Sequence, residues 1–153
     1  MSDILVVFHS QSGNTEKMAD AVAKGVNTTE NAKALYRRAI DTTVGNLKNC
    51  NAVVICSPEY FGYMAGGIKD LFDRTYEKLK DDPGVWKKPY CVVISAGNDG
   101  TFALNHIERI CKGYRFKKIQ NPLICKGQVT DVILAKCFEL GMTVAEGVNA
   151  GIF

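Results

Sequence analysis

The chain has 153 residues, of which 46% are hydrophobic and 23% charged, and its formal net charge at pH 7 is +3. These values are typical of one globular domain, and a chain of this length can bury about 68–70% of the surface that its unfolded form exposes. The charge forms no basic block of the kind that nucleic-acid-binding proteins carry, and no run of 18 apolar residues predicts a membrane span.

The first predicted strand, Ile4–Phe8, leads through a polar stretch into an amphipathic helix from about Asn14 to Val26. Backbone N–H groups at the start of a helix are unpaired and carry partial positive charge, so this stretch suits an anion such as phosphate. It lacks the glycine and lysine pattern of nucleoside-triphosphate loops and the three glycines of dinucleotide-binding loops. Neutral donors would hold the phosphate, unless the stretch is a capped turn with no ligand. The candidate binding residues are Ser10, Gln11, Ser12, Gly13, Asn14 and Thr15.

Strands and helices alternate along the rest of the chain. We expect strands at 32–36, 52–56, 90–94 and 117–125, and helices at 40–49, 64–80, 101–114 and from about 128 to 146, before a loosely structured tail. The continuously apolar strands indicate burial on both faces, as in parallel sheets. Five strand–helix units predict a three-layer α/β sandwich with a five-stranded parallel sheet in the order 2-1-3-4-5, over a single domain of residues 1–153.

Two more loops follow predicted strands and are expected at the same edge of the sheet as the first. One contains two aromatic residues beside a glycine, and the other offers bare backbone. Taken singly, these would be aromatic caps on the core and a glycine-rich turn with an Asp cap. Together with the first loop they predict a pocket for a flat heteroaromatic phosphate, because aromatic rings stack on such a ring and glycine lets backbone approach it. The candidates are Pro58, Glu59, Tyr60, Phe61, Gly62, Ser95, Ala96, Gly97, Asn98, Asp99 and Gly100.

The motifs resemble those of the flavodoxin-like FMN proteins over nearly the whole chain. Residues 10–15 match the flavodoxin phosphate loop, and residues 57–62 are similar to the Pro-x-Tyr/Arg-Phe-Gly loop of flavodoxin-like quinone reductases and NAD(P)H-dependent FMN reductases. The resemblance implies a flavodoxin-like fold, FMN as cofactor and a role in electron transfer. Flavodoxin carriers usually have an aromatic residue in the third loop and a strongly acidic surface, and this chain has neither. The long insertion with which the quinone reductases tetramerise is also absent.

Two functions stay open at this point. The chain is either a flavodoxin-type carrier with a redox partner protein, or a small FMN-dependent oxidoreductase that uses NAD(P)H, a quinone or a similar molecule. A third interpretation is a structural or interaction protein of the same fold that binds no ligand. Tyr63 and Met64, beside the second loop, leave a homodimer open.

No residue is assigned as a catalytic acid or base, and no metal site is expected. His9 is expected to pack at the end of its strand, and His106 to lie on a helix surface. The six cysteines include no Cys-x-x-Cys pair and fall on apolar segments, which is typical of buried, reduced thiols. Because the amino terminus also shows no signal peptide, we expect a cytoplasmic protein that does not bind membranes.

Overall fold

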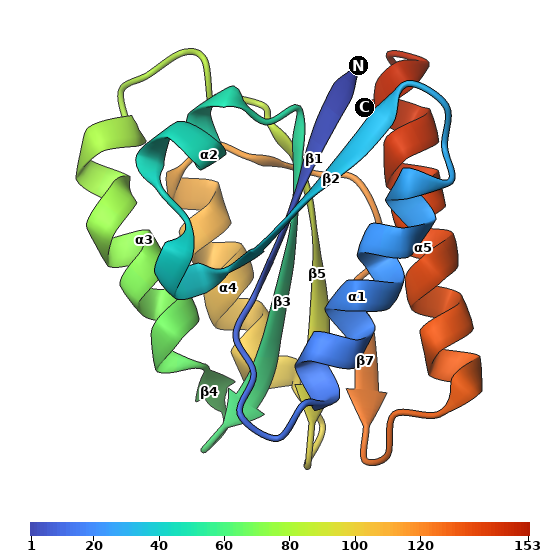
Figure 1. Ribbon diagram of the computed structural model, residues 1–153. Helices are drawn as coiled ribbons and strands as arrows, with labels where there is room; N and C mark the ends of the chain where they lie inside the picture. The colour runs from blue at the N-terminus through green and yellow to red at the C-terminus, as the bar shows by residue number, and fades with distance from the viewer.

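A largely parallel β-sheet runs through the middle of the molecule, and helices pack on both of its faces (Figure 1). The computed structural model describes residues 1–153. In chain order the elements are β1 (Ser2–Phe8), α1 (Asn14–Asn27), β2 (Ala32–Arg38), the 3₁₀ helix η1 (Ala39–Asp41), α2 (Val44–Asn49), β3 (Ala52–Tyr60), β4 (Tyr63–Met64), α3 (Gly66–Leu79), β5 (Pro89–Ala96), α4 (Thr101–Gly113), β6 (Lys117–Lys118), β7 (Leu123–Lys126) and α5 (Asp131–Asn149). Helices α1 and α5 cover one face, and α2, α3 and α4 cover the other (Figure 1).

The order of the strands is β2-β1-β3-β5, with β6 and β7 both paired to the outer edge of β5. The predicted three-layer sandwich and the order 2-1-3-4-5 are therefore confirmed, because β5 is the fourth predicted strand and β6 and β7 together form the fifth. Pro122 lies between these two pieces and has no N–H to donate to a ladder, which explains the break. The short strand β4, which was not predicted, pairs with β3 in antiparallel orientation.

The predicted helix at 40–49 is wrong in its first part. The chain instead makes the 3₁₀ helix η1 and then starts α2 after Thr43. The Thr43 hydroxyl accepts a hydrogen bond from the Asn46 N–H (3.2 Å), and the Asn46 side chain accepts one from the Thr43 N–H (2.9 Å). This reciprocal capping box fixes the start of the helix at Val44, although the apolar pattern predicts an earlier start.

The last helix is shifted along the chain relative to the prediction: it begins and ends three residues later. It starts at Asp131, because the Thr130 hydroxyl accepts a hydrogen bond from the Ile133 N–H (3.4 Å) and caps the first turn. It continues to Asn149, so part of the segment expected to be loose is helical. The ring of Phe153 then folds back against the helix, where any side chain on Gly147 would overlap it.

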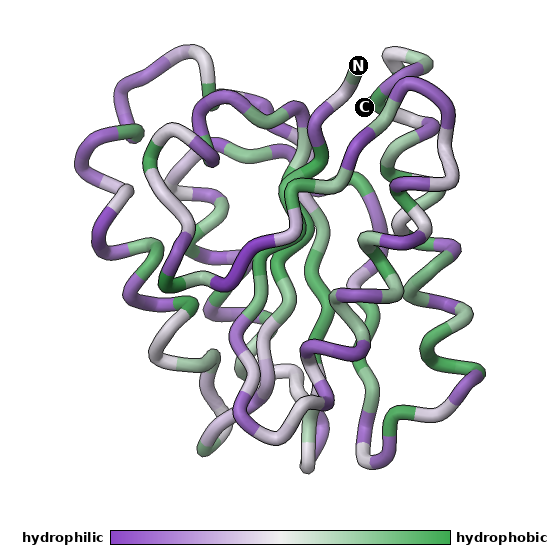
Figure 2. Tube along the Cα trace, in the orientation of Figure 1, coloured by the Kyte–Doolittle hydropathy of each residue, from purple (hydrophilic) through white to green (hydrophobic).

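The core forms two apolar clusters, one on each face of the sheet. Side chains alternate along each strand, so Leu5 and Val7 face α3 and α4, whereas Ile4 and Val6 face α1 and α5. Figure 2 shows this apolar character along the central strands, as the sequence predicts for strands buried on both faces. No helix combines the length and the apolar character that crossing a membrane requires.

All six cysteines are free and buried, as predicted. Cys56 and Cys91 lie in the sheet within the cluster that faces α1 and α5. Burial raises the pKa of the Cys91 thiol to about 12 and the pKa of Cys56 well above its usual value. These thiols are therefore protonated at neutral pH, which makes them poor nucleophiles and poor metal ligands.

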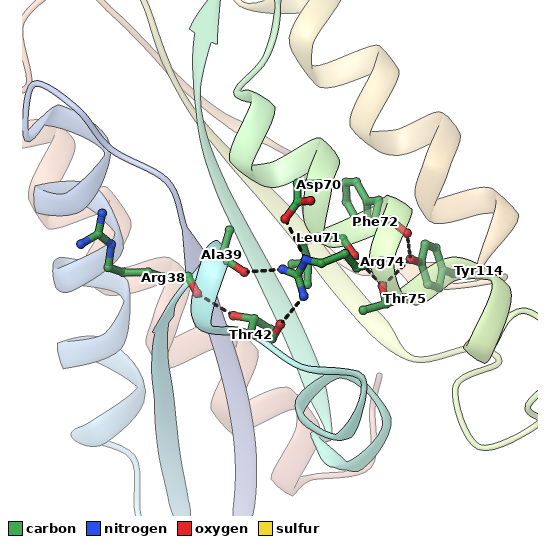
Figure 3. A network of polar contacts seen from close by, with 9 residues as sticks. All are labelled: Arg38, Ala39, Thr42, Asp70, Leu71, Phe72, Arg74, Thr75 and Tyr114. Carbon is green, nitrogen blue, oxygen red and sulfur yellow. Dashed lines mark hydrogen bonds and ion pairs between the residues drawn. The ribbon is translucent and has the colours of Figure 1, made fainter.

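Arg74 ties the connection after β2 to helix α3 (Figure 3). Its guanidinium donates to the carbonyl oxygens of Ala39 (3.0 Å) and Thr42 (3.1 Å), and its Nε is paired with Asp70 at 2.7 Å. These bonds satisfy carbonyl groups of an irregular segment that has no ladder partner. They hold η1 against the helix whose amino end lies beside the second loop.

Helices α3 and α4 are joined by a buried pair of hydroxyl groups (Figure 3). The Thr75 hydroxyl lies 2.8 Å from the Tyr114 hydroxyl, and the latter donates to the Phe72 carbonyl at 3.0 Å. Because Tyr114 is fully buried, its hydroxyl would otherwise lose its hydrogen bonds to water. The pair sets the spacing of the two helices that follow β4 and β5.

Helices α1 and α5 approach each other at two glycines. A Cβ on Gly25 would overlap the carbonyl oxygen of Phe138, and a Cβ on Gly141 would overlap the carbonyl oxygen of Val22. In both cases the obstacle is backbone and not a side chain that can move away. The two helices therefore pack backbone against backbone, and the position of α1, which begins at the first loop, depends on α5.

We expect Gly141→Ala to lower the free energy of unfolding by about 1–3 kcal/mol, because the added methyl group overpacks this contact. Urea unfolding followed by circular dichroism measures the change. Gly45→Ala is the matched control, since Gly45 lies in α2 with only an ordinary contact at 3.6 Å. The control should be neutral or stabilising by up to about 1 kcal/mol. Equal effects of the two substitutions would contradict the close approach.

Candidate functional site

The carboxyl ends of β1, β3 and β5 meet at one edge of the sheet, at the bottom of Figure 1. The three predicted loops follow these strands, so the fold gathers them at this edge. β3 lies between β1 and β5, which makes the second loop the neighbour of both others. The edge is where parallel α/β sheets bind ligands.

The first loop presents a row of backbone N–H groups without partners. Gly13 adopts a left-handed conformation (φ 98°), and its own N–H donates to the Ser10 hydroxyl at 3.1 Å. No side chain caps helix α1. The N–H groups that make no hydrogen bond within the chain are those of Ser10, Gln11, Ser12, Asn14, Thr15 and Glu16. Such a set of donors at a helix start is suited to an anion with several oxygen atoms.

The second loop is mostly strand. β3 continues through Pro58 to Tyr60 and turns into β4 over Phe61 and Gly62, so only these two residues form a loop. Both have positive φ (52° and 73°), as a two-residue hairpin turn requires. For a bulky residue this conformation costs about 1–2 kcal/mol, and the ring of Phe61 is also fully exposed. The hairpin thus holds a strained, bare aromatic ring at the edge of the sheet.

Ser57 fixes the base of this hairpin. Its buried hydroxyl donates to the Pro58 carbonyl (2.8 Å) and accepts from the Ala65 N–H (3.0 Å), directly before helix α3 begins. Ser57 was not among the predicted site residues. The sequence contained one sign of this role: Ser57 directly follows a continuously apolar strand. A hydroxyl at such a position is expected to be buried and to bond a backbone group.

Glu59 joins the second loop to the third. Its two carboxylate oxygens accept hydrogen bonds from the N–H groups of Asn98 (3.2 Å) and Gly100 (2.9 Å). The Glu59 carboxylate is therefore directed at the third loop, and those two N–H groups are engaged by the protein itself.

The third loop keeps two free donors. The N–H groups of Gly97 and Asp99 make no hydrogen bond within the chain. The Asp99 carboxylate accepts from the Thr101 N–H (2.8 Å) at the start of α4, whereas the N-cap position itself is occupied by Gly100. Ser95 and Ala96 are the last residues of β5 and are buried, so they support the loop from below.

His9 connects the first loop to the second. Its ring lies edge-on to Tyr60, with the ring centres 6.0 Å apart, and a Cβ on Gly67 would overlap its Nδ1. The expectation that it packs at the strand end is correct, yet neither ring nitrogen has a hydrogen-bond partner in the chain. Burial and the nearby charge of Arg38 lower the pKa of His9 below its usual 6.5.

An aromatic cluster that was not predicted flanks the hairpin. The rings of Tyr63 and His106 lie 4.8 Å apart, and those of Phe102 and His106 lie 5.3 Å apart. β4 and the first turns of α4 bring these residues together. Sequence periodicity could not reveal the cluster, because the pairing of β4 with β3 decides which helix residues lie beside Tyr63.

The sequence profile of a family described as NADPH-dependent FMN reductase matches residues 3–123. An NAD(P)H dehydrogenase (quinone) of Geobacter sulfurreducens is 27% identical over 128 residues, which cover 68% of this chain and 60% of that protein. Another of Paracoccus denitrificans is 33% identical over 94 residues, covering 49% of this chain and 45% of that protein. The chain thus spans about half the length of the curated relatives it matches.

Solved structures show the same fold. A flavodoxin from the domain Archaea superposes with a TM-score of 0.84 at 24% identity, over 97% of this chain and 99% of that one. A WrbA-like flavodoxin from Agrobacterium tumefaciens superposes with a TM-score of 0.82 at 18% identity, over 98% and 99% of the two chains. The predicted flavodoxin-like fold is confirmed.

We expect Glu59→Gln to speed amide hydrogen exchange at Asn98 and Gly100, because a carboxamide has one acceptor oxygen where the carboxylate has two. Exchange measured by NMR on the protein without added ligand tests this. Glu77→Gln, which removes a carboxylate from the exposed surface of α3, is the control and should leave both amides unchanged. Unchanged exchange in Glu59→Gln would show that the carboxylate does not hold the loop in solution.

Proposed function

Because the chain belongs to the NADPH-dependent FMN reductase family, its cofactor is FMN, and we propose that it is a small oxidoreductase that takes electrons from NAD(P)H and passes them to a quinone or a similar acceptor. The observation that carries the placement of the cofactor is the row of unpaired N–H groups in residues 10–16. The electron donor and the quinone acceptor are taken from the names of the relatives. Their use by this chain is part of the proposal, since the chain spans only part of the relatives' length.

The residues at the edge of the sheet fit FMN in charge and in shape. The first loop offers unpaired donors and no carboxylate before Glu16, as a phosphate group requires. A Cβ placed on Gly62 or Gly97 would meet no atom within 4 Å, so the second and third loops leave open space beside their backbones. Tyr60 and Phe61 add aromatic surface at the same edge.

In this proposal the first loop binds the phosphate through residues 10–15. The buried Thr15 hydroxyl and the Asn14 amide add side-chain donors to the backbone groups, and Gly13 provides the turn that aims them. The helix dipole of α1 adds partial positive charge at this position. This arrangement distinguishes FMN from riboflavin, which has no phosphate.

The second and third loops form the walls for the ring. Pro58 to Gly62 present aromatic surface, and residues 95–100 present backbone, of which the N–H groups of Gly97 and Asp99 are free to bond a ligand. Glu59 keeps the two walls at a constant distance. FMN, when bound, supplies the capacity to accept a hydride and to release electrons, and the protein supplies binding, orientation and electrostatics.

The family match and the charge favour a reductase over a carrier. The net charge of +3 suits anionic dinucleotides better than a basic protein partner. A carrier is the second candidate, because the chain covers 99% of a solved flavodoxin and has the size of such a carrier. Six buried, free thiols agree with a reducing compartment, and we keep the cytoplasm as the proposed location. A homodimer and a specific redox partner also stay proposals.

Anaerobic mixing with NADPH or NADH tests the function. We expect the purified protein to shift the visible spectrum of FMN and quench its fluorescence. NAD(P)H should then bleach the bound flavin within seconds and without any partner protein, and a soluble quinone should restore the colour. Bound FMN that neither nucleotide reduces would favour the carrier. No perturbation of FMN by the protein would contradict both candidates.

Thr15→Val should weaken FMN binding about tenfold, because the variant keeps the shape of the side chain and loses a hydroxyl donor to a charged group. Fluorescence titration with FMN and with riboflavin measures the effect, and riboflavin binding should not change. Thr28→Val, which lies just beyond the carboxyl end of α1, is the control. An equal loss for riboflavin would place the phosphate elsewhere.

A further inference from the structure

We propose that the groove between α3 and α4 binds the adenosine and phosphate part of NAD(P)H, with Arg109 as the phosphate contact. This inference rests on the proposed function, because it takes the nicotinamide ring to react at the pocket formed by the second and third loops. It assigns a location to the part of the dinucleotide that does not react, and it names the side chain that binds it.

The groove starts at the edge of the proposed site. Helices α3 and α4 both begin at the edge of the sheet where the three loops lie, and they run away from it side by side (Figure 1). Tyr63 lines the groove and directly follows Gly62 of the second loop. It is also the partner of Tyr60 across the hairpin. The groove and the second loop therefore share one hairpin.

The groove has room for part of a nucleotide. Its volume is about 550 Å³, which lies within the range of small-molecule sites. Its lining on α4 runs from His106 to Gly113, and these residues are about 10 Å apart along the helix axis. At the far end the ring of Tyr76 lies against Gly113, where an added Cβ would be 3.1 Å from it.

The near end of the groove offers aromatic surface with free polar atoms. The rings of Tyr63 and His106 lie 4.8 Å apart, and the exposed ring of Phe102 lies 5.3 Å from His106. A flat heteroaromatic base can stack on such rings. The hydroxyl groups of Tyr63 and Tyr76 and the ring nitrogens of His106 make no hydrogen bond within the chain, so they are free to bond a ligand.

One cation in the groove has no partner. Lys69 is paired with Asp73 at 2.6 Å, and Glu77 is paired with Lys80 at 2.7 Å. Arg109 also lines the groove, and its guanidinium makes neither an ion pair nor a hydrogen bond within the chain. The groove therefore carries one unbalanced positive charge, in a side chain that can bind a phosphate through two parallel N–H groups.

These features select the occupant. Aromatic surface, free hydroxyl groups and an unbalanced guanidinium suit a nucleotide better than a purely apolar molecule. NAD(P)H is the substrate of the proposed function that carries a second nucleotide beyond its reacting ring. The phosphate at Arg109 belongs either to the diphosphate, which NADH and NADPH share, or to the additional phosphate on the adenosine ribose of NADPH.

Anaerobic rapid mixing of the FMN-loaded protein with NADPH or NADH gives the Kd of each dinucleotide and the limiting rate of flavin reduction. Arg109→Gln should raise the Kd about threefold to tenfold and leave the limiting rate unchanged, because Arg109 contacts the part that does not react. An equal effect on both dinucleotides assigns the contact to the diphosphate, and an effect on NADPH alone assigns it to the additional phosphate. Lys112→Gln, which removes an exposed cation of α4 outside the groove, is the control.

N-benzyl-dihydronicotinamide separates the two parts of the substrate, because it has the reacting ring and neither adenosine nor phosphate. Its reaction should be the same in the wild type and in Arg109→Gln. An unchanged Kd for both dinucleotides in this variant, or an equal loss with the benzyl compound, would overturn the inference. Reduction of bound FMN by none of the three donors would contradict the proposed function instead.

NMR with NADP⁺ tests the groove without any electron transfer. NADP⁺ carries both kinds of phosphate and cannot reduce FMN. In the FMN-saturated protein it should shift the ring signals of His106 and the amide signals of Tyr63 and Ile110, and Arg109→Gln should weaken this binding. If these signals do not move at millimolar NADP⁺, the inference is wrong, even where NAD(P)H reduces the flavin.

Discussion

The carboxylate of Glu59 is the contact on which the geometry of the site depends. It projects from the end of β3 and bonds two N–H groups of the loop after β5, so the walls of the proposed ring pocket are joined before any ligand is present. Parallel pairing of β3 and β5 brings the two strand ends together, and the Glu59 carboxylate bridges the loops beyond them. The pocket is therefore preorganised by one residue, which reduces the entropy that binding would otherwise cost.

The sequence predicts the architecture because the signals for it are local. Apolar runs such as Val53–Ile55 identify strands buried on both faces, and the rhythm of strands and helices leaves one common topology. The edge of the site follows from that topology, since parallel strands carry their loops on the same side. The first loop is also local: its hydroxyls, amides and single glycine lie within one turn. The residues that form each of these features are close together both along the chain and in space.

The rest depends on contacts between distant segments. Glu59 could be recognised as a member of the second loop, but not as the partner of Asn98 and Gly100, because nothing in a sequence states where a carboxylate points. The same holds for His9, because the sequence does not reveal that its ring packs against Gly67 of α3. The predicted helix starts were wrong where a side-chain hydroxyl accepts a hydrogen bond from a backbone N–H group. Thr43 and Thr130 do this at the starts of α2 and α5.

The backbone contact of α1 with α5 couples the last helix to the proposed cofactor site. Helix α1 starts at the first loop and is locked along its length to the last helix of the chain. A ligand that orders the amino end of α1 therefore stabilises α5 by linkage, although the two never touch. Conversely, proteolysis of α5, or a fused tag that displaces Phe153, is expected to lower the affinity of the first loop for its ligand. Folding of the last helix and ligand binding at the first loop are therefore thermodynamically coupled.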